Sequence, residues 1–402
     1  MERKLYKIIF ICILVAASFG LRFYFLPKQG FSSDIGLFLY WGERIADEGL
    51  AAVYNKNAYY QGVDYPFLIP LATSWLVKAV SGTGFDKAYI FKLIPTAGEI
   101  VLLLISGFLI VRSKIKYKWL LLVFALIQPP LALVTSAWGQ VDSLLSLSIL
   151  ISFLLINKNS YLSTFFLFLG ILLKPQALPA IAIFFLYFIL QKKYKEFALQ
   201  FILFLGLFLI SALIFRQFAD ASFLDPYIKS VGRYDNSSLN AFNLWWAVYG
   251  RGSWDISDKF GDIINLRQQG LIIFSIFFVP VLTYLGFKKR SFLELCLVLA
   301  YTYLIFFVFP TEIHERYLYP AVVFFALSSL LNKRIFIIFL IISASYLVNV
   351  FSVLQTFYPQ FGFLRFDLLE GGWTRVVAIA NVLIAFYLAM YLIYESFKKV
   401  KT

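Results

Sequence analysis

The chain has 402 residues, of which 61% are hydrophobic and only 14% are charged, and its mean hydropathy is +0.80. Soluble domains carry roughly 25% charged residues, so this composition excludes a soluble fold. The apolar runs are long and do not alternate with polar residues, which also excludes a membrane β-barrel. We therefore expect an all-α polytopic membrane protein. Both cysteines lie in apolar runs, without the spacing of a disulfide framework or a zinc site.

The apolar segments predict about twelve membrane helices, because a span needs roughly 20 apolar residues. The first segment follows the charged start Met1–Lys4, and we interpret it as an uncleaved span since no small-x-small cleavage site precedes the next polar loop. The spans are expected near residues 6–26, 89–111, 119–137, 143–157, 160–174, 176–190, 197–215, 270–287, 291–309, 317–331, 335–355 and 374–394.

The net charge of +14 is distributed unevenly along the chain. Almost all of the excess Lys and Arg falls in the short segments 1–7, 112–118, 157–160, 191–196, 287–290, 332–334 and 395–402. By the positive-inside rule, these segments and both termini are cytoplasmic in a multi-pass cell-membrane protein. The charge thus reports topology and gives no argument for a nucleic-acid partner. If the apolar stretch 66–81 also spanned, the cationic segment 112–118 would lie outside, so we predict that 66–81 is a helix on the outer surface.

A single membrane domain then accounts for residues 1–402, with long outer loops at 28–88 and 216–269. In the first loop, apolar residues at helical spacing after Ser32-Ser33 predict an amphipathic helix with Asp34 in its first turn. A helix N-terminus favours an ionised carboxylate, which suits a general base, although Asp34 could simply complement the helix dipole. Later in this loop, in the segment Tyr59–Pro66, Asp64 and Tyr65 could face a sugar, or Asp64 could only cap the next helix.

Polar residues also mark the outer ends of several spans. In the segment Trp138–Asp142, Gln140 and Asp142 could accept sugar hydroxyls, or Asp142 could only cap the following helix. Lys174 breaks the charge bias by lying outside; it could extend to the headgroups or bind an anion such as a lipid phosphate. In the second long loop, Asn240 and Trp245 combine amide and aromatic groups, which suits carbohydrate or an interfacial aromatic belt.

The only histidine lies in a polar break, Pro310–Tyr317, between two apolar runs. A charge cluster at the membrane edge is a candidate functional site. His314 and Arg316 supply hydrogen-bond donors, and arginine binds phosphate with two parallel hydrogen bonds. Glu315 could hold either cation in place. The chain lacks a phosphate-binding Gly-rich loop and an Asp-x-Asp pair, so we expect a donor carried on a lipid rather than on a nucleotide.

Taken together, these segments resemble the GT-C glycosyltransferases over residues of about 30 to 320. The resemblance is closest to bacterial and archaeal relatives of the second mannosyltransferase of GPI-anchor synthesis, and weaker to the dolichyl-phosphate-glucose glucosyltransferases of N-glycan assembly. The matching segments are Asp34 with the aromatic residues that follow it, Asp64-Tyr65-Pro66, Trp138–Asp142, Leu173–Gln176, Asn240–Trp245 and His314–Tyr317. Relatives often have two prolines after the tyrosine, whereas Phe67 follows Pro66 here, which weakens the assignment of the acceptor-side loop.

The resemblance implies a GT-C-like bundle that transfers a hexose, mannose by likeness, with inversion. The donor would be a polyprenyl-phosphate sugar, and the acceptor a glycan, glycolipid or protein outside the cytoplasm. Asp34 would be the general base, and Lys174, His314 and Arg316 would bind the donor phosphate. Acceptor or sugar contacts are expected from Asp64, Tyr65, Gln140, Asp142, Glu315, Asn240 and Trp245. No cofactor is expected; a divalent metal is not favoured, although the three aspartates could converge on a cation.

Two other functions fit a polytopic chain. One is a transporter or flippase, whose site would lie at the midplane, where Glu99 is a candidate. The other is a polymerase or ligase that uses a diphosphate-linked oligosaccharide. A non-catalytic scaffold remains a third interpretation, and the sequence does not assign an oligomeric state.

Overall fold

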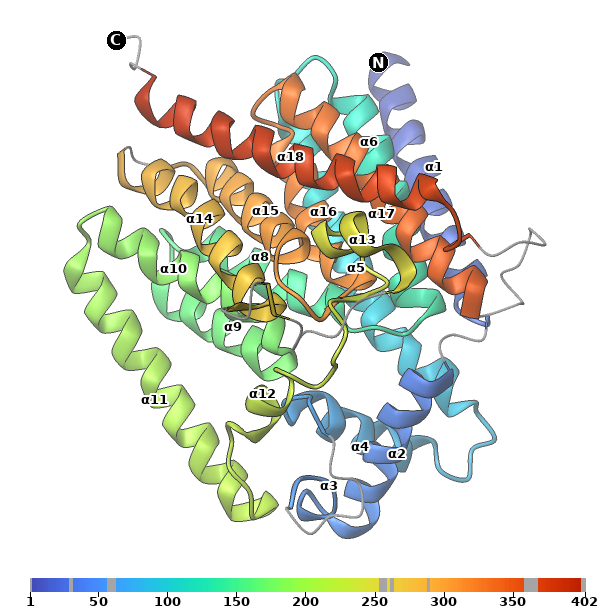
Figure 1. Ribbon diagram of the computed structural model, residues 1–402. Helices are drawn as coiled ribbons and strands as arrows, with labels where there is room; N and C mark the ends of the chain where they lie inside the picture. The colour runs from blue at the N-terminus through green and yellow to red at the C-terminus, as the bar shows by residue number, and fades with distance from the viewer. Residues whose placement is uncertain are drawn as a thin grey trace.

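The described part of the chain is a helical bundle with a smaller group of helices at one end (Figure 1). The computed structural model describes residues 2–28, 32–55, 63–252, 259–260, 264–287, 290–357 and 368–398. The start of α1 (Glu2–Phe25) and the end of α18 (Gly372–Phe397) lie together at one end of the molecule. The opposite end, here called the loop end, is formed by α2 (Ser32–Glu48), α3 (Ala51–Tyr54) and α4 (Leu68–Val80).

Each expected span coincides with a helix or with consecutive helical pieces. Among the described residues, seven helices are long and apolar enough to cross a membrane: α1, α5 (Lys87–Arg112), α6 with its continuation (Lys118–Ala137), α11 (Tyr194–Ala219), α14 (Leu266–Phe287), α17 (Lys333–Phe357) and α18. The remaining expected spans are shorter helices: α8 (Asp142–Leu155), α9 (Ser160–Leu173), α10 (Leu178–Leu190), α15 (Phe292–Val308) and α16 (Tyr319–Ser328). The protein is thus an all-α polytopic membrane protein, as the composition predicts.

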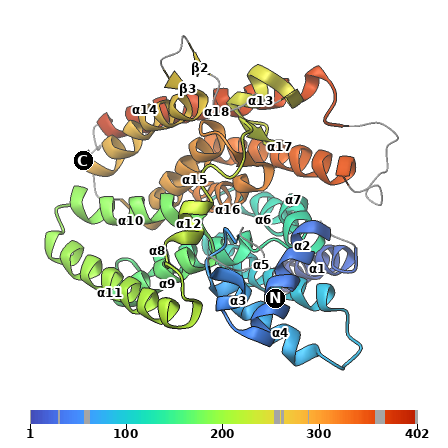
Figure 2. The same cartoon turned by 60° about the horizontal axis from the view of Figure 1, so that its bottom comes forward.

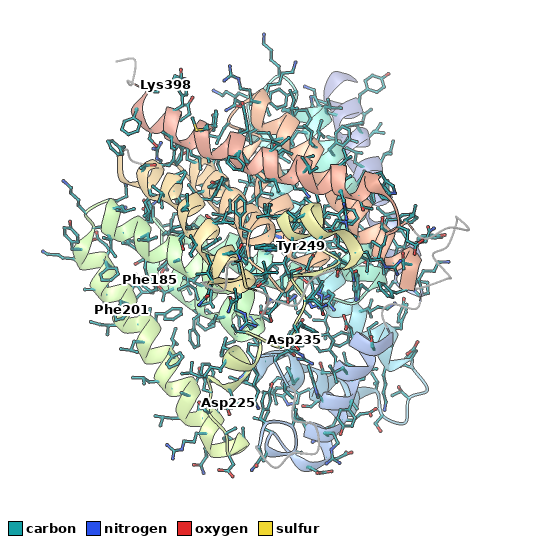
Figure 3. All side chains as sticks on the ribbon, viewed as in Figure 1. Phe185, Phe201, Asp225, Asp235, Tyr249 and Lys398 are labelled. Atoms are coloured by element: carbon teal, nitrogen blue, oxygen red, sulfur yellow. The ribbon has the colours of Figure 1, made fainter. Side chains whose placement is uncertain are left out.

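The centre of the bundle is formed by α15 and α16, whose side chains are buried on nearly all faces. A capping box between Ser291 and Glu294 starts α15. In contrast, α11 stands at the edge and exposes most of its apolar side chains, which is expected of a helix that faces lipid. It is attached to α10 by aromatic contacts such as Phe185 with Phe201, whose ring centroids are 5.8 Å apart (Figure 3).

The third expected span, 119–137, is present as the helical run Lys118–Ala137, but this run is not one regular α-helix. It divides into α6 (Lys118–Ile127), the short α7 (Pro129–Ala132) and a π-helical turn, η1 (Leu133–Ala137). The break occurs at Gln128, whose φ is 23°, because Pro129 and Pro130 lack amide donors and cannot continue the hydrogen bonding of α6. Such π-helical turns are frequent at functional sites.

At the loop end, α2 packs closely across α4 (Figure 2). Gly42 permits the contact, because a Cβ there would meet Cγ2 of Thr73 at 2.6 Å. The buried aromatic residues Phe38 and Trp41 of α2 belong to the apolar core of this end, and Phe215 joins it from α11. The stretch 66–81 is therefore helical as predicted, and it packs on α2 and α5 outside the bundle centre.

Short strands and turns connect the longer elements. The parallel pair β1 (Ser238–Leu239) and β4 (Ile313–His314) joins the second long loop to the histidine segment, with Leu239 opposite His314. The other elements are η2 (Pro175–Ala177), α12 (Asp225–Lys229), α13 (Leu244–Tyr249), η3 (Gly250–Gly252), the antiparallel strands β2 (Lys259–Phe260) and β3 (Ile264–Asn265), and η4 (Glu315–Leu318).

Some predictions concern residues outside the described ranges. These are the 59–62 part of the first-loop motif and portions of the predicted cytoplasmic segments 1–7, 287–290 and 395–402.

Candidate active site

Two adjoining cavities lie between the loop end and the bundle. The smaller, here the acid cavity, is about 50 Å³ and is lined by Asp34, Leu37, Phe38, Trp41, Asp64, Tyr65, Gln140, Arg233, Tyr234 and Arg316. The larger, here the apolar cavity, is about 230 Å³. Four residues line both: Asp64, Tyr65, Tyr234 and Arg316. Asp235 is labelled in Figure 3 and follows Tyr234 in the chain, so its label helps to locate this region.

Asp34 lies in the first turn of α2, as predicted, and is held by two donors on one oxygen. The indole Nε1 of Trp138 donates to Oδ2 at 3.0 Å, and Nε2 of Gln140 donates to the same atom at 2.6 Å. No side chain in the described ranges donates to Oδ1. The carboxylate is therefore fixed in direction while one oxygen stays available to a ligand in the acid cavity.

The segment that supplies these donors needs glycine at its centre. Gly139 has a φ of 86°, in the left-handed region. A Cβ at this position would also meet Cγ of Lys92 at 3.0 Å and side-chain atoms of Ile35 at 3.2 Å. Close packing of α2 and α5 around Gly139 thus brings Trp138 and Gln140 to the carboxylate of Asp34.

Arg316 carries a positive charge into both cavities. Its guanidinium lies 5.5 Å from the ring centroid of Trp138 and bonds Oε1 of Glu315 at 3.3 Å. Burial by itself lowers the pKa of Arg316, but Asp34 and Glu315 outweigh this effect, and the resulting pKa is well above its ordinary value. Its buried Nε atom has no partner among the described residues, so a donor remains for an anion.

His314 is half-buried beside the apolar cavity, between the rings of Tyr234 and Tyr317, each with its centroid 5.4 Å away. Burial, together with the charges of Arg316 and Lys174, holds the pKa of His314 well below its ordinary value. The imidazole is therefore neutral at pH 7 in the free protein. It can donate a hydrogen bond from one nitrogen and accept one at the other.

Lys174 and Asp142 meet as a buried ion pair, with Nζ 2.9 Å from both carboxylate oxygens. The ammonium lies 5.3 Å from the ring centroid of Tyr317 and 5.9 Å from that of Tyr65. Neither member of the pair lines the two cavities. The structure thus brings both predicted residues to the cluster, but behind the two tyrosine rings and paired with each other.

The two long loops meet over the acid cavity. Nη1 of Arg233 lies 2.5 Å from Oδ1 of Asp64, and the hydroxyl of Tyr65 donates to Oε1 of Gln140 at 3.4 Å. Arg233 was not expected from the sequence, because a single arginine in a polar loop has no local pattern to mark it. Trp41 was also not assigned a role, yet it lines the cavity and its buried Nε1 has no partner in the described ranges.

Three other predicted site residues support the cluster from behind. The backbone of Asn240 pairs with that of His314 in an isolated antiparallel β-bridge. The backbone oxygen of Asn240 accepts a hydrogen bond of 2.7 Å from Nδ2 of Asn349. The indole of Trp245 donates to the backbone oxygen of Phe309 at 2.8 Å. Neither residue lines the two cavities. Glu315 is buried, which raises its pKa, and it pairs with Arg316.

The apolar cavity extends from this cluster toward the bundle. Its lining includes Leu178 and Pro179 of α10, Leu271 of α14 and Phe306 of α15. An ion pair between Arg267 and Glu312, 2.8 Å apart, lies at the loop side of the cavity. The cavity therefore joins a mainly apolar part to an end lined by paired charges and hydrogen-bonding groups. Within the described ranges, no three His, Cys, Asp or Glu side chains are grouped as metal ligands.

Comparison with known proteins gives one family. The family model of glycosyltransferase family 87 matches residues 89–310, more than half of the chain. This range includes the Trp138–Asp142 segment, Lys174 and Arg233, whereas Asp34 precedes it and His314 follows it. The comparison with curated proteins gives no match.

Proposed function

The chain belongs to glycosyltransferase family 87, and we propose that it transfers a hexose from a polyprenyl-phosphate donor to an acceptor hydroxyl outside the cytoplasm. Family membership and the apolar helices make it a membrane glycosyltransferase. Our proposal adds the donor class, the inverting mechanism, and a glycan, glycolipid or protein acceptor. Mannose, and the closer relation to the second GPI mannosyltransferase, rest on sequence likeness alone.

One observation carries the proposal. The base candidate Asp34 and the guanidinium-bearing Arg316 line the same acid cavity, and Arg316 also lines the apolar cavity. A lipid-linked phosphate sugar has these three parts in this order: an isoprenoid chain, a phosphate and a hexose. The phosphate would lie beside Arg316 and His314, and the first isoprene units would occupy the apolar cavity while the rest of the chain stays in lipid. The sugar would point toward Asp34, where the acid cavity must widen to take a hexose.

The phosphate of such a donor is a diester with a single negative charge. Arg316 supplies its free Nε, His314 donates one hydrogen bond, and Lys174 adds positive charge from behind Tyr317. Arg233, paired with Asp64 at the rim of the acid cavity, is a further cation within this group. Fixed charges of this kind stabilise a leaving anion more than the bound substrate.

Transfer proceeds in one displacement. Oδ1 of Asp34 accepts the proton of the acceptor hydroxyl while that oxygen attacks the anomeric carbon. The bond between this carbon and the phosphate oxygen breaks, and its electron pair stays on the lipid phosphate, which gains a second negative charge. Asp64 is the other carboxylate that lines the acid cavity, and Arg233 holds it. This leaves Asp34 as the base and favours inversion without a glycosyl-enzyme intermediate.

We place the site on the extracytoplasmic side of the cell membrane, with both termini in the cytoplasm. The charge distribution supports this orientation. The arrangement of the helices agrees with it, because the start of α1 and the end of α18 lie at the end of the molecule opposite to α2, α3 and α4.

The test is a transfer assay with purified protein and defined lipid donors. Polyprenyl-phosphate-mannose and polyprenyl-phosphate-glucose are supplied in separate reactions with extracted membrane glycolipids, and mass spectrometry detects a mass increase of one hexose. A third reaction contains a polyprenyl-diphosphate oligosaccharide. Transfer from a phosphate-linked hexose is expected. Transfer only from the diphosphate-linked glycan would replace the proposal by a polymerase or ligase, and solute counterflow without transfer would indicate a transporter.

A further inference from the structure

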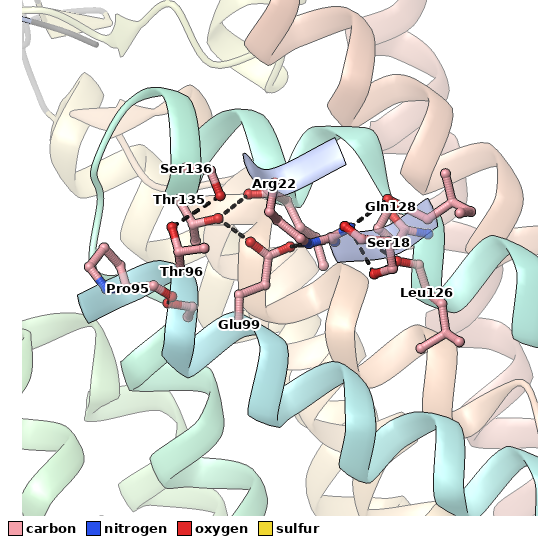
Figure 4. A network of polar contacts seen from close by, with 12 residues as sticks. Ser18, Arg22, Pro95, Thr96, Glu99, Leu126, Gln128, Thr135 and Ser136 are labelled. Carbon is pink, nitrogen blue, oxygen red and sulfur yellow. Dashed lines mark hydrogen bonds and ion pairs between the residues drawn. The ribbon is translucent and has the colours of Figure 1, made fainter. Parts of the chain in front are cut away.

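A buried ion pair inside the apolar bundle connects α1 to α5. Arg22 and Glu99 are fully buried, and Nη2 of Arg22 lies 2.7 Å from Oε1 of Glu99 (Figure 4). Neither residue lines the acid or the apolar cavity. Buried ion pairs add little to stability compared with apolar residues of similar volume, so this pair needs another explanation.

The arginine side of the pair holds the break in the third span. Nη1 of Arg22 donates to the backbone oxygens of Leu126 and Ile127, at 3.2 Å each. These carbonyls belong to the last turn of α6, where the proline pair prevents further helical hydrogen bonds. Ser18 of α1 adds a bond of 2.8 Å to the oxygen of Leu126. Arg22 therefore caps α6 at the point where the chain changes direction.

The glutamate side holds the π-helical turn that follows. The hydroxyl of Thr135, in η1, donates to Oε2 of Glu99. Next to it, the hydroxyls of Ser136 and Thr96 are 3.0 Å apart, which attaches η1 to α5 a second time. The turn is thus fixed to α5 by two side-chain hydrogen bonds.

Backbone bonds then lead from η1 to the candidate base. The amide of Trp138 donates to the oxygen of Leu133 at 2.9 Å, and the amide of Gln140 donates to the oxygen of Val134 at 3.0 Å. The side chains of the same two residues donate to Oδ2 of Asp34. A continuous series of short contacts therefore joins the intramembrane pair to the carboxylate.

We propose that Arg22 and Glu99 are positioning residues for the transfer reaction. They fix the π-helical turn, and the turn fixes the two donors that orient Asp34. This inference rests on the proposed role of Asp34 as the base. A π-helical turn gains its extra residue at the expense of regular hydrogen bonding, so it needs outside contacts to keep one geometry. Glu99 supplies one of them through Thr135, while Arg22 holds Glu99 and caps the helix that leads into the turn. The low dielectric of the bundle makes the contacts strong and directional.

The mildest test removes a single hydroxyl. Thr135→Val keeps the shape of the side chain but releases η1 from Glu99, whereas Thr135→Ser keeps the hydroxyl. Ser106→Ala is the matched control. Ser106 is buried like Thr135 but lies in α5, and among the described residues its hydroxyl donates to the backbone oxygen of Leu102 in the same helix. The measurements are kcat, donor KM and amide exchange of a peptide covering residues 133–142.

For Thr135→Val we expect kcat to fall about tenfold with donor KM within about twofold of wild type, because the orientation of the base changes while the donor site is untouched. Exchange in residues 133–142 becomes faster. Thr135→Ser and Ser106→Ala behave like wild type in all three measurements.

A double variant separates positioning from stability. Arg22→Met with Glu99→Leu replaces the ion pair by apolar groups, which is usually neutral or favourable for stability. A folded double variant with unchanged kcat and exchange would overturn the inference, as would an unchanged kcat in Thr135→Val. If the wild-type protein transfers no hexose, the proposed function fails, while the exchange measurement still decides whether the pair holds the turn.

Discussion

At the scale of single residues, the main feature of the site is which atoms of Asp34 and Arg316 have hydrogen-bond partners and which do not. Trp138 and Gln140 occupy one oxygen of Asp34 and leave the other to the cavity. Glu315 occupies Nη1 of Arg316 and leaves Nε without a partner among the described residues. Each of these two groups is thus anchored by one atom and presents another, which suits chemistry that needs a fixed base and a fixed anion site.

The first prediction concerns the base. Asp34→Asn should lower kcat by about 100-fold or more, because the amide cannot accept the proton of the acceptor hydroxyl. Donor KM should stay near the wild-type value, since the phosphate contacts are unchanged. Asp47→Asn is the matched control: it makes the same change in the same helix at an exposed position. If Asp34→Asn turned over at the control rate, Asp34 would not be the base.

The second prediction concerns the phosphate site. Arg316→Lys keeps the charge but loses the planar group that can bond both the phosphate and Glu315. We expect donor KM to rise about tenfold, which corresponds to the loss of one charge-assisted hydrogen bond. The steady-state kinetics are compared with those of Arg251→Lys, an arginine that pairs with Glu370 outside both cavities. An unchanged KM would mean that Arg316 does not bind the donor.

The third prediction uses the single histidine of the chain. Because the pKa of His314 is held well below 6.5 in the fold, the unfolded chain binds its proton more readily. The stability that goes with a neutral His314 is complete above pH 6.5. As the pH falls from 6.5 toward the folded pKa, this stability is lost, and the free energy of unfolding decreases by roughly 1.4 kcal/mol per pH unit.

The measurement is the thermal unfolding midpoint in detergent, without donor, for wild type and His314→Gln. The wild-type midpoint should fall more steeply below pH 6.5 than that of the variant. Glu315, whose pKa burial raises, titrates in both proteins, so the difference between the curves reports the imidazole. Parallel curves would show that His314 is not held neutral by its surroundings.

At the scale of elements, the segment after η1 shows how a short connection sets the position of a catalytic group. Gly139 adopts a left-handed φ of 86° between Lys92 and Ile35, where a Cβ has no room. The fourth prediction is that Gly139→Ala lowers the free energy of unfolding by about 1–2 kcal/mol through backbone strain, and lowers kcat because Trp138 and Gln140 move away from Asp34.

Gly36→Ala is the control for this prediction. Gly36 lies within α2 and a Cβ there meets no atom within 4 Å, so alanine should be neutral or slightly stabilising. Unfolding midpoints and kcat are measured for both variants. Equal effects of the two substitutions would contradict the role given to the left-handed turn.

The positions of the helices could be predicted from the sequence, because apolar runs of about 20 residues are a strong signal. The break inside 119–137 was not foreseen, although Pro129 and Pro130 mark it. An apolar pattern continues through a proline pair, and the stabilising cap comes from Arg22 in another helix. Contacts of this kind join residues that are distant in the chain, and periodicity carries no information about them.

The same reason limits the prediction of the site. Asp34, His314 and Arg316 stood out as charges at the edges of apolar runs, and the structure brings them to adjoining cavities. Whether a charge lines a cavity or supports one depends on its partner: Lys174 is held by Asp142, 32 positions away. Arg233 and Trp41 had no sequence signal of their own. Their roles as cation and as donor stay predictions until variants are measured.

At the scale of the whole molecule, polar chemistry is concentrated toward one end. Residues of α2 line the acid cavity, while the start of α1 and the end of α18 lie toward the opposite end of the molecule (Figure 1). A lipid-linked donor needs this arrangement, because its chain must remain in the bilayer while its sugar reaches polar residues at the surface.

The fifth prediction tests this orientation. In a chain with Cys12 and Cys296 replaced by alanine, Thr83→Cys places a thiol in the exposed connection before α5, and Lys114→Cys places one in the exposed connection after it. A membrane-impermeant maleimide should label Thr83→Cys in intact cells and Lys114→Cys only after permeabilisation. The reverse pattern would place the cavities in the cytoplasm, where a lipid donor facing outward could not reach them.

The positive charge that neutralises Glu99 belongs to Arg22 of α1, and α1 precedes α5 in the chain. A ribosome delivers α1 to the bilayer before α5, so the guanidinium of Arg22 is already present when the carboxylate arrives. A lone acidic group inside an apolar segment opposes insertion by about 2.5–3.5 kcal/mol, and neutralisation by a partner removes much of this barrier. The second span therefore relies on the first to enter lipid, so the order of synthesis contributes to the assembly of the enzyme.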